Sequence, residues 1–168
     1  LSLGAALLGL GRTRDAVASL EPALTARPNH PDTCFTLAEA YRAEGRIEEA
    51  YATAKAGLAA RPDYLQGRIA MADALLDMGR HEEARAAFED ILDDYPSDMT
   101  VLGKLGVFHY SVGEFDAAET KLSMAVAAKP DDVEAHWHLA TLYLSQRRWN
   151  EGWGLYGWRW SMSKTVAQ

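Results

Sequence analysis

Glutamate and histidine residues come nearest to forming a chemical site in this sequence. Glu134 and His138 are one helical turn apart, so on a helix they share a face and could contact a metal ion. His136 is two residues from His138 and therefore points in another direction. Without a third ligand, we interpret Glu134 and His138 as a solvated polar pair.

Three other motifs lack residues that their chemistry requires. His81-Glu82-Glu83 begins like a zinc-protease motif, but Arg85 stands where the second histidine is needed. Gly9-Leu10-Gly11 follows no strand, so it predicts a turn and not a phosphate-binding loop. Cys34 has no charged neighbour in sequence and is interpreted as a packed, unreactive thiol. We therefore expect no catalytic residue, no metal site and no cofactor.

The elements that carry these residues recur every 34 residues. Four prolines show this step: Pro28, Pro62, Pro96 and Pro130. Glycines and alanines keep the same step, at Gly11, Gly45, Gly79 and Gly113 and at Ala16, Ala50, Ala84 and Ala118. A period of this length is typical of stacked helical hairpins, so we predict an all-α solenoid.

Each repeat contains two expected helices. Apolar residues at helical spacing predict first helices at Asp32 to Glu44 and at Asp98 to Val112, each ended by a glycine. Second helices are expected at Ile47 to Ala60 and at Phe115 to Ala128, because the residue before a proline is pushed out of the α region. One hairpin cannot bury its apolar face alone, so neighbouring hairpins stack.

These columns resemble the tetratricopeptide repeat family. The matching residues are Met71, Ala72, Leu75, Gly79, Ala84, Phe88 and Pro96 in the third unit, and Leu105, Gly106, Gly113, Ala118, Leu122, Ala125 and Pro130 in the fourth. Arg68, His109 and His136 depart from the family's apolar pattern. The resemblance implies a right-handed superhelical solenoid of about five antiparallel helix hairpins, the first one partial. The units are roughly 1–28, 29–62, 63–96, 97–130 and 131–160, with a tail at 161–168.

Composition excludes several functions. The net charge of −7 and the absence of a basic run argue against nucleic-acid binding. No apolar run reaches membrane-spanning length, and the single cysteine fits a reducing compartment, so we expect a cytoplasmic protein without a membrane partner. The sequence opens at Leu1 inside an expected helix, and we interpret it as a piece of a longer protein.

The resemblance places the first helix of each hairpin on a concave inner surface. The expected partner-binding residues there are Phe35, Glu39, Arg42, Ile69, Asp73, Leu76, Val107, Tyr110, Trp137, Thr141 and Leu144, beside Gly103. Leu37, Met71, Leu105 and Leu139 already supply a core column, so we expect the inner residues not to be needed for stacking. An apolar strip on a protein surface usually marks a binding site. The alternative is that these residues pack between adjacent first helices.

The chemistry of the inner face predicts a class of ligand. Apolar residues flanked by Glu39, Arg42 and Asp73 suit an amphipathic helix or an extended segment of a client polypeptide. Some proteins of this family hold a terminal carboxylate with lysines and asparagines. Here only Arg42 and Lys104 are available, so that role is not expected.

The last unit has an aromatic face. Trp149, Trp153, Tyr156 and Trp160 recur at steps of four, three and four. We expect Trp149 and Tyr156 in the core, and Trp153 and Trp160 to dock a downstream domain or a partner, because a terminal repeat is ordinarily polar outside. Residues 148–160 also resemble the closing repeat of bacterial tetratricopeptide regions that precede a glycosyltransferase domain.

Two hypotheses remain open at this point. In the first, the chain is a non-enzymatic adaptor that binds a protein or peptide client in an apolar groove, as the substrate-recruiting part of a larger protein such as a protein glycosyltransferase. In the second, it is a scaffold that assembles into a homo-oligomer through its groove or its tryptophan-rich C-terminal helix.

Overall fold

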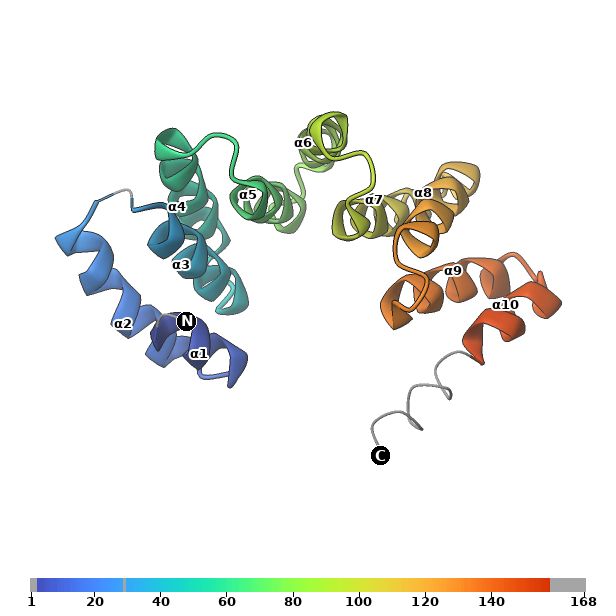
Figure 1. The fold of residues 1–168 in the computed structure, drawn as a ribbon, viewed down its shortest axis with the longest axis horizontal. Coiled ribbons are helices and arrows are strands. Elements are labelled where there is room, and N and C mark those ends of the chain that lie inside the picture. Colours follow the sequence, from blue (N-terminus) through green and yellow to red (C-terminus); the bar gives the residue numbers. More distant parts are fainter. Residues whose placement is uncertain (1–2, 29, 158–168) are drawn as a thin grey trace. The chain divides into compact units, whose positions relative to one another are not determined.

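The computed structural model describes residues 3–28 and 30–157, which form ten α-helices and no strand (Figure 1). This confirms the all-α class and the helical hairpins. The helices are α1 (Leu3–Gly9), α2 (Thr13–Ala26), α3 (Pro31–Ala43), α4 (Ile47–Ala60), α5 (Leu65–Asp77), α6 (His81–Asp94), α7 (Met99–Ser111), α8 (Phe115–Ala128), α9 (Val133–Ser145) and α10 (Trp149–Tyr156).

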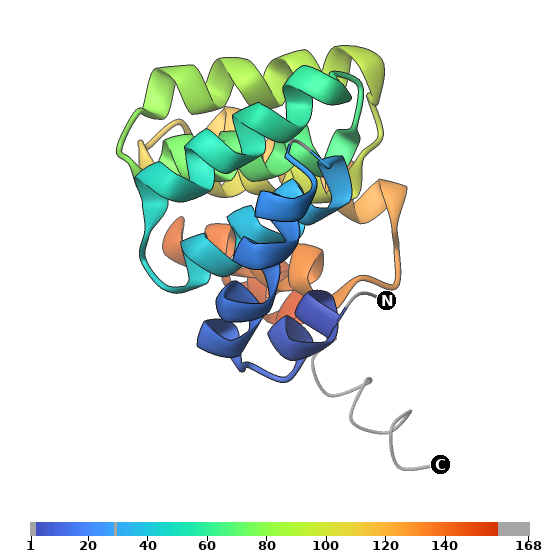
Figure 2. The same cartoon turned by 90° about the vertical axis from the view of Figure 1, so that its left-hand side faces the viewer.

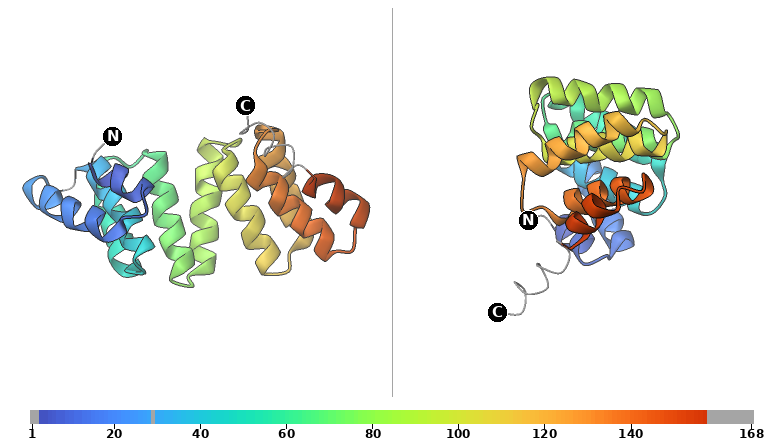
Figure 3. Two further views of the ribbon diagram at one scale, coloured as in Figure 1. Left: turned by 90° about the horizontal axis from the view of Figure 1, so that it is seen from below. Right: turned by 90° about the vertical axis from the view of Figure 1, so that its right-hand side faces the viewer.

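The chain divides into two compact units, residues 1–91 and 92–168, which we call unit 1 and unit 2. In unit 1, the hairpins α1–α2 and α3–α4 pack against each other, and α5 packs on both α3 and α4 (Figure 2). In unit 2, α7 pairs with α8 and α9 pairs with α10, while α9 also contacts α7 and α8 (Figure 3). Each unit therefore repeats one packing scheme.

The turn inside each hairpin uses a left-handed residue. Gly11, Gly45, Gly79 and Gly113 have φ between 71° and 83°. This backbone region costs a side chain about 1–2 kcal/mol, which explains the recurring glycine. The fifth hairpin keeps the same turn with Arg147, at φ 62°.

The interior of each unit is built from the repeated apolar columns. In unit 1 the main cluster contains Leu7, Ala16, Val17, Leu20, Leu37, Ala40, Tyr41 and Ala50. In unit 2 the clusters contain Ala118, Leu122, Leu139 and Leu142, and Leu102, Ala125 and Ala135. The expected core column is buried at Leu37, Leu105 and Leu139 and half-buried at Met71. Burial of these columns is what joins one hairpin to the next.

The polar residues that interrupt the apolar columns are paired. Arg68 Nη2 lies 2.9 Å from Asp90 Oδ2. Buried His136 donates from Nδ1 to the Asp132 carbonyl over 2.7 Å, and His109 Nδ1 lies 2.6 Å from Glu114 Oε2. Burial without a partner would cost each of these groups free energy. The departures from the apolar pattern are thus accommodated locally.

Cys34 is fully buried. Burial raises the pKa of its thiol, although a backbone hydrogen bond opposes the rise, so little thiolate forms near neutral pH. None of the helices within residues 3–28 and 30–157 has the length and apolar character needed to cross a bilayer.

Candidate partner-binding surfaces

The expected inner-face residues all lie on first helices of hairpins. Those on α3 and α5 belong to unit 1, and those on α7 and α9 belong to unit 2. They therefore form two surfaces, which have different chemistry.

Phe35 and Ile69 are not surface residues. Phe35 is 5% exposed and Ile69 is 6% exposed. The Phe35 ring stacks on Tyr64 with centroids 4.6 Å apart, in space left by Gly57 and Gly67. A Cβ at Gly67 would overlap that ring, and one at Gly57 would lie 2.8 Å from its Cε1. The expectation that these inner residues are not needed for stacking is therefore wrong for Phe35, which fills the contact between α3, α4 and the start of α5.

The charged residues of the α3–α5 surface pair with one another. Arg42 Nη1 lies 2.8 Å from Asp73 Oδ2, and Arg42 Nε lies 2.8 Å from Asp77 Oδ2. Asp73 is buried, so Arg42 links α3 to α5 and compensates a desolvated carboxylate. Arg42 is therefore engaged within the protein. Leu76 is half-buried beside these residues in sequence.

Glu39 is a partly desolvated carboxylate close to Arg42 and Asp73. Partial desolvation raises the pKa of its carboxyl; Arg42 opposes the rise and Asp73 adds to it. The carboxylates of Glu39, Asp73 and Asp77 thus all lie near the Arg42 guanidinium.

We expect Glu39→Gln to raise the free energy of unfolding at pH 7. A carboxyl whose pKa is raised on folding stabilises the fold only while protonated, so its contribution is present below the ordinary glutamate pKa of about 4.3 and lost as pH rises through the folded value. The gain should therefore disappear in urea unfolding curves recorded below that pH. Glu48→Gln, in the exposed first turn of α4, is the control: it removes a favourable charge at a helix N-terminus and should lower stability slightly. A gain for Glu39→Gln that persists at low pH would contradict this explanation.

The α7–α9 surface of unit 2 exposes apolar side chains. Val107 on α7 is 37% exposed and Trp137 on α9 is 45% exposed. Tyr110 is half-buried and lies 6.1 Å from the Phe115 ring, centroid to centroid. Thr141 is half-buried, and its hydroxyl donates to the Trp137 carbonyl. Leaving large apolar side chains in water is unfavourable, so covering this surface would stabilise the protein.

Gly103 and Leu144 mark the limits of the α7–α9 surface. A Cβ added at Gly103 would meet no atom within 4 Å, so the backbone of α7 is open there. Leu144, by contrast, lies against α10, where a Cβ at Gly152 would be 2.7 Å from its Cγ and Cδ2. Leu144 therefore packs within the α9–α10 hairpin, and is not free to contact a partner with its whole side chain.

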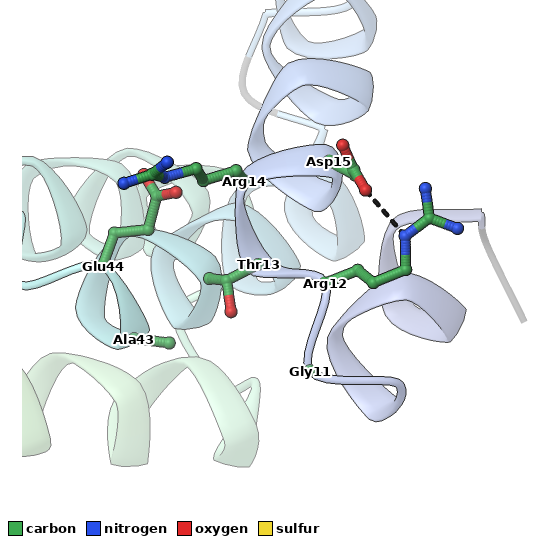
Figure 4. A pocket seen from close by; sticks show the side chains of 7 residues that line it. All are labelled: Gly11, Arg12, Thr13, Arg14, Asp15, Ala43 and Glu44. Atoms are coloured by element: carbon green, nitrogen blue, oxygen red, sulfur yellow. Dashed lines mark hydrogen bonds and ion pairs between the residues drawn. The ribbon is translucent and has the colours of Figure 1, made fainter.

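A polar pocket of about 550 Å³ lies in unit 1 between the α1–α2 turn and the end of α3. Its lining is Gly11, Arg12, Thr13, Arg14, Asp15, Ala43 and Glu44. Figure 4 shows Arg12 turned toward Asp15 and away from α3, whereas Arg14 extends toward Glu44. Both signs of charge meet here, so the pocket favours no one ligand charge.

The aromatic face of the last unit is only partly inside the protein. Trp149 is 54% exposed, so the expectation that it belongs to the core is wrong; Phe115, one repeat earlier, is also exposed. Trp153 is 58% exposed and contacts the half-buried Tyr156 edge-on, with centroids 5.5 Å apart. Trp160 lies outside the described residues.

Comparison with known families identifies the repeat. Two tetratricopeptide repeat models match the chain, one at residues 7–72 and the other at 69–132 and 109–152. The chain belongs to the tetratricopeptide repeat family. The repeats stack hairpins into extended binding surfaces, so membership supports a protein–protein interaction module. No curated protein sequence matches the chain significantly.

Solved tetratricopeptide repeat structures agree with this assignment. The Thermus thermophilus protein TTC0263, a thermophilic TPR protein, is 29% identical, with 92% of this chain and 85% of that chain covered at a TM-score of 0.82. PilF of Pseudomonas aeruginosa is 21% identical, with coverage of 93% and 71% and a TM-score of 0.81. MamA of Desulfovibrio magneticus is 17% identical, with coverage of 99% and 93% and a TM-score of 0.72. The last two likenesses concern the fold alone.

Sequence reasoning missed two features of these tetratricopeptide surfaces. One is the pairing of Arg42 with Asp73 and Asp77, for which the opposite charges 31 and 35 positions apart were the available signal. The other is the burial of Phe35, which the coincidence of Gly57 and Gly67 in the next elements could have indicated.

Proposed function

We propose that this chain is a protein-interaction module whose α7–α9 surface binds an apolar segment of a client polypeptide. The observation that carries the proposal is the exposure of Val107 and Trp137 on adjacent first helices, next to open backbone at Gly103. Large aromatic residues are the side chains that most often dominate binding energy at interfaces.

The α7–α9 surface suits a helix or an extended segment that carries a bulky apolar anchor. Because Gly103 has no side chain, such an anchor can approach the backbone of α7 while it contacts Val107 and Trp137. The half-buried Tyr110 and Thr141 offer hydroxyl groups that can receive polar groups at the edge of the segment. Burying the anchor supplies affinity, and the hydroxyl groups supply orientation.

The α3–α5 surface adds a preference of its own. This surface presents the exposed carboxylate of Glu39, which attracts lysine or arginine side chains of a client. It does not attract a terminal carboxylate, because Arg42 already serves two carboxylates of the chain. Phe35 and Ile69 support the surface from the interior and do not contact the client.

Residues 148–160 suggest the kind of parent protein that contains this module. Its resemblance to repeats that precede bacterial glycosyltransferase domains supports a parent protein that modifies the client captured by the repeats. In that setting the present residues recruit the acceptor polypeptide and take no part in the transfer.

Selection of a phage-displayed random peptide library on the wild-type chain tests the proposal. We expect enriched peptides to carry aromatic or aliphatic anchors, and their affinity, measured by calorimetry, to fall at least about tenfold in Gly103→Leu and in Trp137→Ser. Leucine at position 103 fills the open space over α7 and favours the helix, so lost binding cannot be attributed to lost folding.

Gly154→Leu is the matched control for that selection. Gly154 is on α10, is exposed, and also has nothing within 4 Å of an added Cβ. This variant should bind the enriched peptides like wild type. Enriched peptides that bind Gly103→Leu and Trp137→Ser undiminished would contradict the proposed surface, as would a selection that enriches none.

A further inference from the structure

The start of α8 differs in charge from the start of the other second helices. In the part of the chain that the structure describes, the residue before α2, α4, α6 and α10 is an arginine, at Arg12, Arg46, Arg80 and Arg148. Each of these arginines bonds the acid three positions later, as Arg46 does with Glu49. The residue before α8 is Glu114, and Ala117 stands three positions later. No arginine therefore neutralises the first turn of α8 from this position.

Two carboxylates lie at the start of α8. Glu114 Oε2 is 2.6 Å from Nδ1 of the buried His109, and this contact fixes the glutamate side chain, which is 49% exposed. Asp116 is also exposed, and its carboxylate forms no hydrogen bond or ion pair with another described residue. Negative charge is thus presented to the solvent on both sides of residue 115.

The residue between these carboxylates is an exposed aromatic. Phe115 is 43% exposed, although α9 packs on both α7 and α8. Its ring is tilted against that of Tyr110, with centroids 6.1 Å apart. An aromatic face attracts a cation, and the neighbouring carboxylates add to that attraction. Lysine and arginine suit such a place because their apolar stems can cover the ring while the charged group meets the acids.

The Phe115 ring continues the apolar face of α7. Gly103, Val107 and Tyr110 are spaced by four and three residues, so they share one face of the helix. Gly103 and Tyr110 are about 10 Å apart along the helix axis, and Phe115 is the next ring after Tyr110. The strip from Gly103 to Phe115 is therefore up to about 17 Å long. An extended segment of about five residues covers it, as does a helix of about eleven.

We propose that a client segment bound on α7 places a lysine or arginine over the Phe115 ring, between Glu114 and Asp116. The inference rests on the proposed function, which supplies the segment and its apolar anchor at Gly103. It adds a charge and a direction: the basic residue lies at the end of the segment that reaches the α7–α8 turn. A segment with the opposite order of anchor and basic residue binds more weakly.

The composition of peptides selected from a random library on the wild-type chain tests this inference. We expect enriched peptides to carry lysine or arginine at a fixed distance from the apolar anchor, about five positions in extended peptides or about eleven in helical ones. Replacing that residue by norleucine should weaken binding about tenfold in calorimetry, and replacing it by glutamate should weaken binding further.

Substitutions at the start of α8 identify the site of the basic residue. Phe115→Leu keeps an apolar side chain but removes the aromatic face, so it should weaken binding of the basic peptide about tenfold. Combined with the norleucine peptide, it should cost little more than either change alone, because both remove one contact. Phe115→Trp should retain the preference for lysine or arginine. Selection on Asp116→Lys should enrich glutamate or aspartate at the same spacing.

Glu48→Lys is the matched control for Asp116→Lys. Glu48 is exposed and holds the same place in α4, two repeats earlier, but it follows the aliphatic Ile47. This variant should bind the basic peptide like wild type, and circular dichroism confirms that each variant is folded. Apolar anchors enriched without a basic residue at fixed spacing overturn this inference and leave the proposed function standing. Additive losses, or an equal effect of Glu48→Lys, also overturn it, whereas a selection that enriches no peptide contradicts both proposals.

Discussion

We expect Phe35→Ala to lower the free energy of unfolding of unit 1 by about 3–5 kcal/mol. The ring of Phe35 is 5% exposed, stacks on Tyr64 and occupies the space over Gly57 and Gly67. Truncation removes this packing and leaves a void bordered by two residues that have no side chain to fill it. The surrounding helices can close it only by shifting α5 toward α3, and the Arg42 contacts to Asp73 and Asp77 hold that spacing.

Urea unfolding followed by circular dichroism measures this effect. Phe115→Ala is the matched control, because the same chemical change is made at a ring that is 43% exposed, and it should cost no more than about 1 kcal/mol. A loss for Phe35→Ala as small as that expected for Phe115→Ala would contradict the packing role of Phe35.

We expect Gly106→Ala to lower the free energy of unfolding of unit 2 by about 1–3 kcal/mol. A Cβ at this position would lie 2.5 Å from Leu122 Cγ and 3.3 Å from the backbone nitrogen of Leu122. Leu122 is 1% exposed and packs with Leu139 and Leu142, so it cannot move aside without disturbing α9. The close approach of α7 to α8 therefore depends on the missing methyl group.

Gly103→Ala provides the opposite result on the same helix. Its added Cβ meets nothing within 4 Å, so alanine should stabilise α7 by about 1 kcal/mol through helix propensity alone. Thermal unfolding of both variants beside the wild type is sufficient to compare the signs. A stabilising Gly106→Ala would contradict the close packing of α7 on α8.

The hairpins could be predicted accurately from the sequence, because the residues that determine them act on the local backbone. The observed bounds of α4 and α8 coincide with the expected ranges, and α3 and α7 differ from theirs by one residue at each end. Glycine at the turn and proline after the second helix act on the backbone of their immediate neighbours, so they can be recognised without knowing the rest of the fold.

The surfaces were harder to predict because they depend on what lies opposite. A 34-residue step places Phe35, Ile69, Gly103 and Trp137 in one column, yet the first two are buried and the last is 45% exposed. Periodicity gives the direction of a side chain on its helix. It does not give the volume that a neighbouring helix leaves free, which for Phe35 was decided by Gly57 and Gly67.

The partners of the charged residues also differed from the expected ones. Arg42 and Asp73 were expected to meet charges of a client at the edge of the groove, but they meet each other. Trp149 was expected in the core because of its apolar repeat column, and its exposure, like that of Phe115 one repeat earlier, shows that such a column can also lie at the surface.

Cysteine and tryptophan occur in different parts of the chain, so each can be used to follow the unfolding of its own part. Cys34 is the single cysteine, is fully buried, and lies in unit 1, whereas all five tryptophans of the sequence follow residue 136, in unit 2. Thiol labelling therefore follows the exposure of one part of the chain, and indole emission follows the other, without any added probe. Because stacked repeats are coupled only to their neighbours, the two signals change together only if that coupling exceeds the stability of each part alone. A lag between them in one unfolding experiment gives the cooperativity of the array directly.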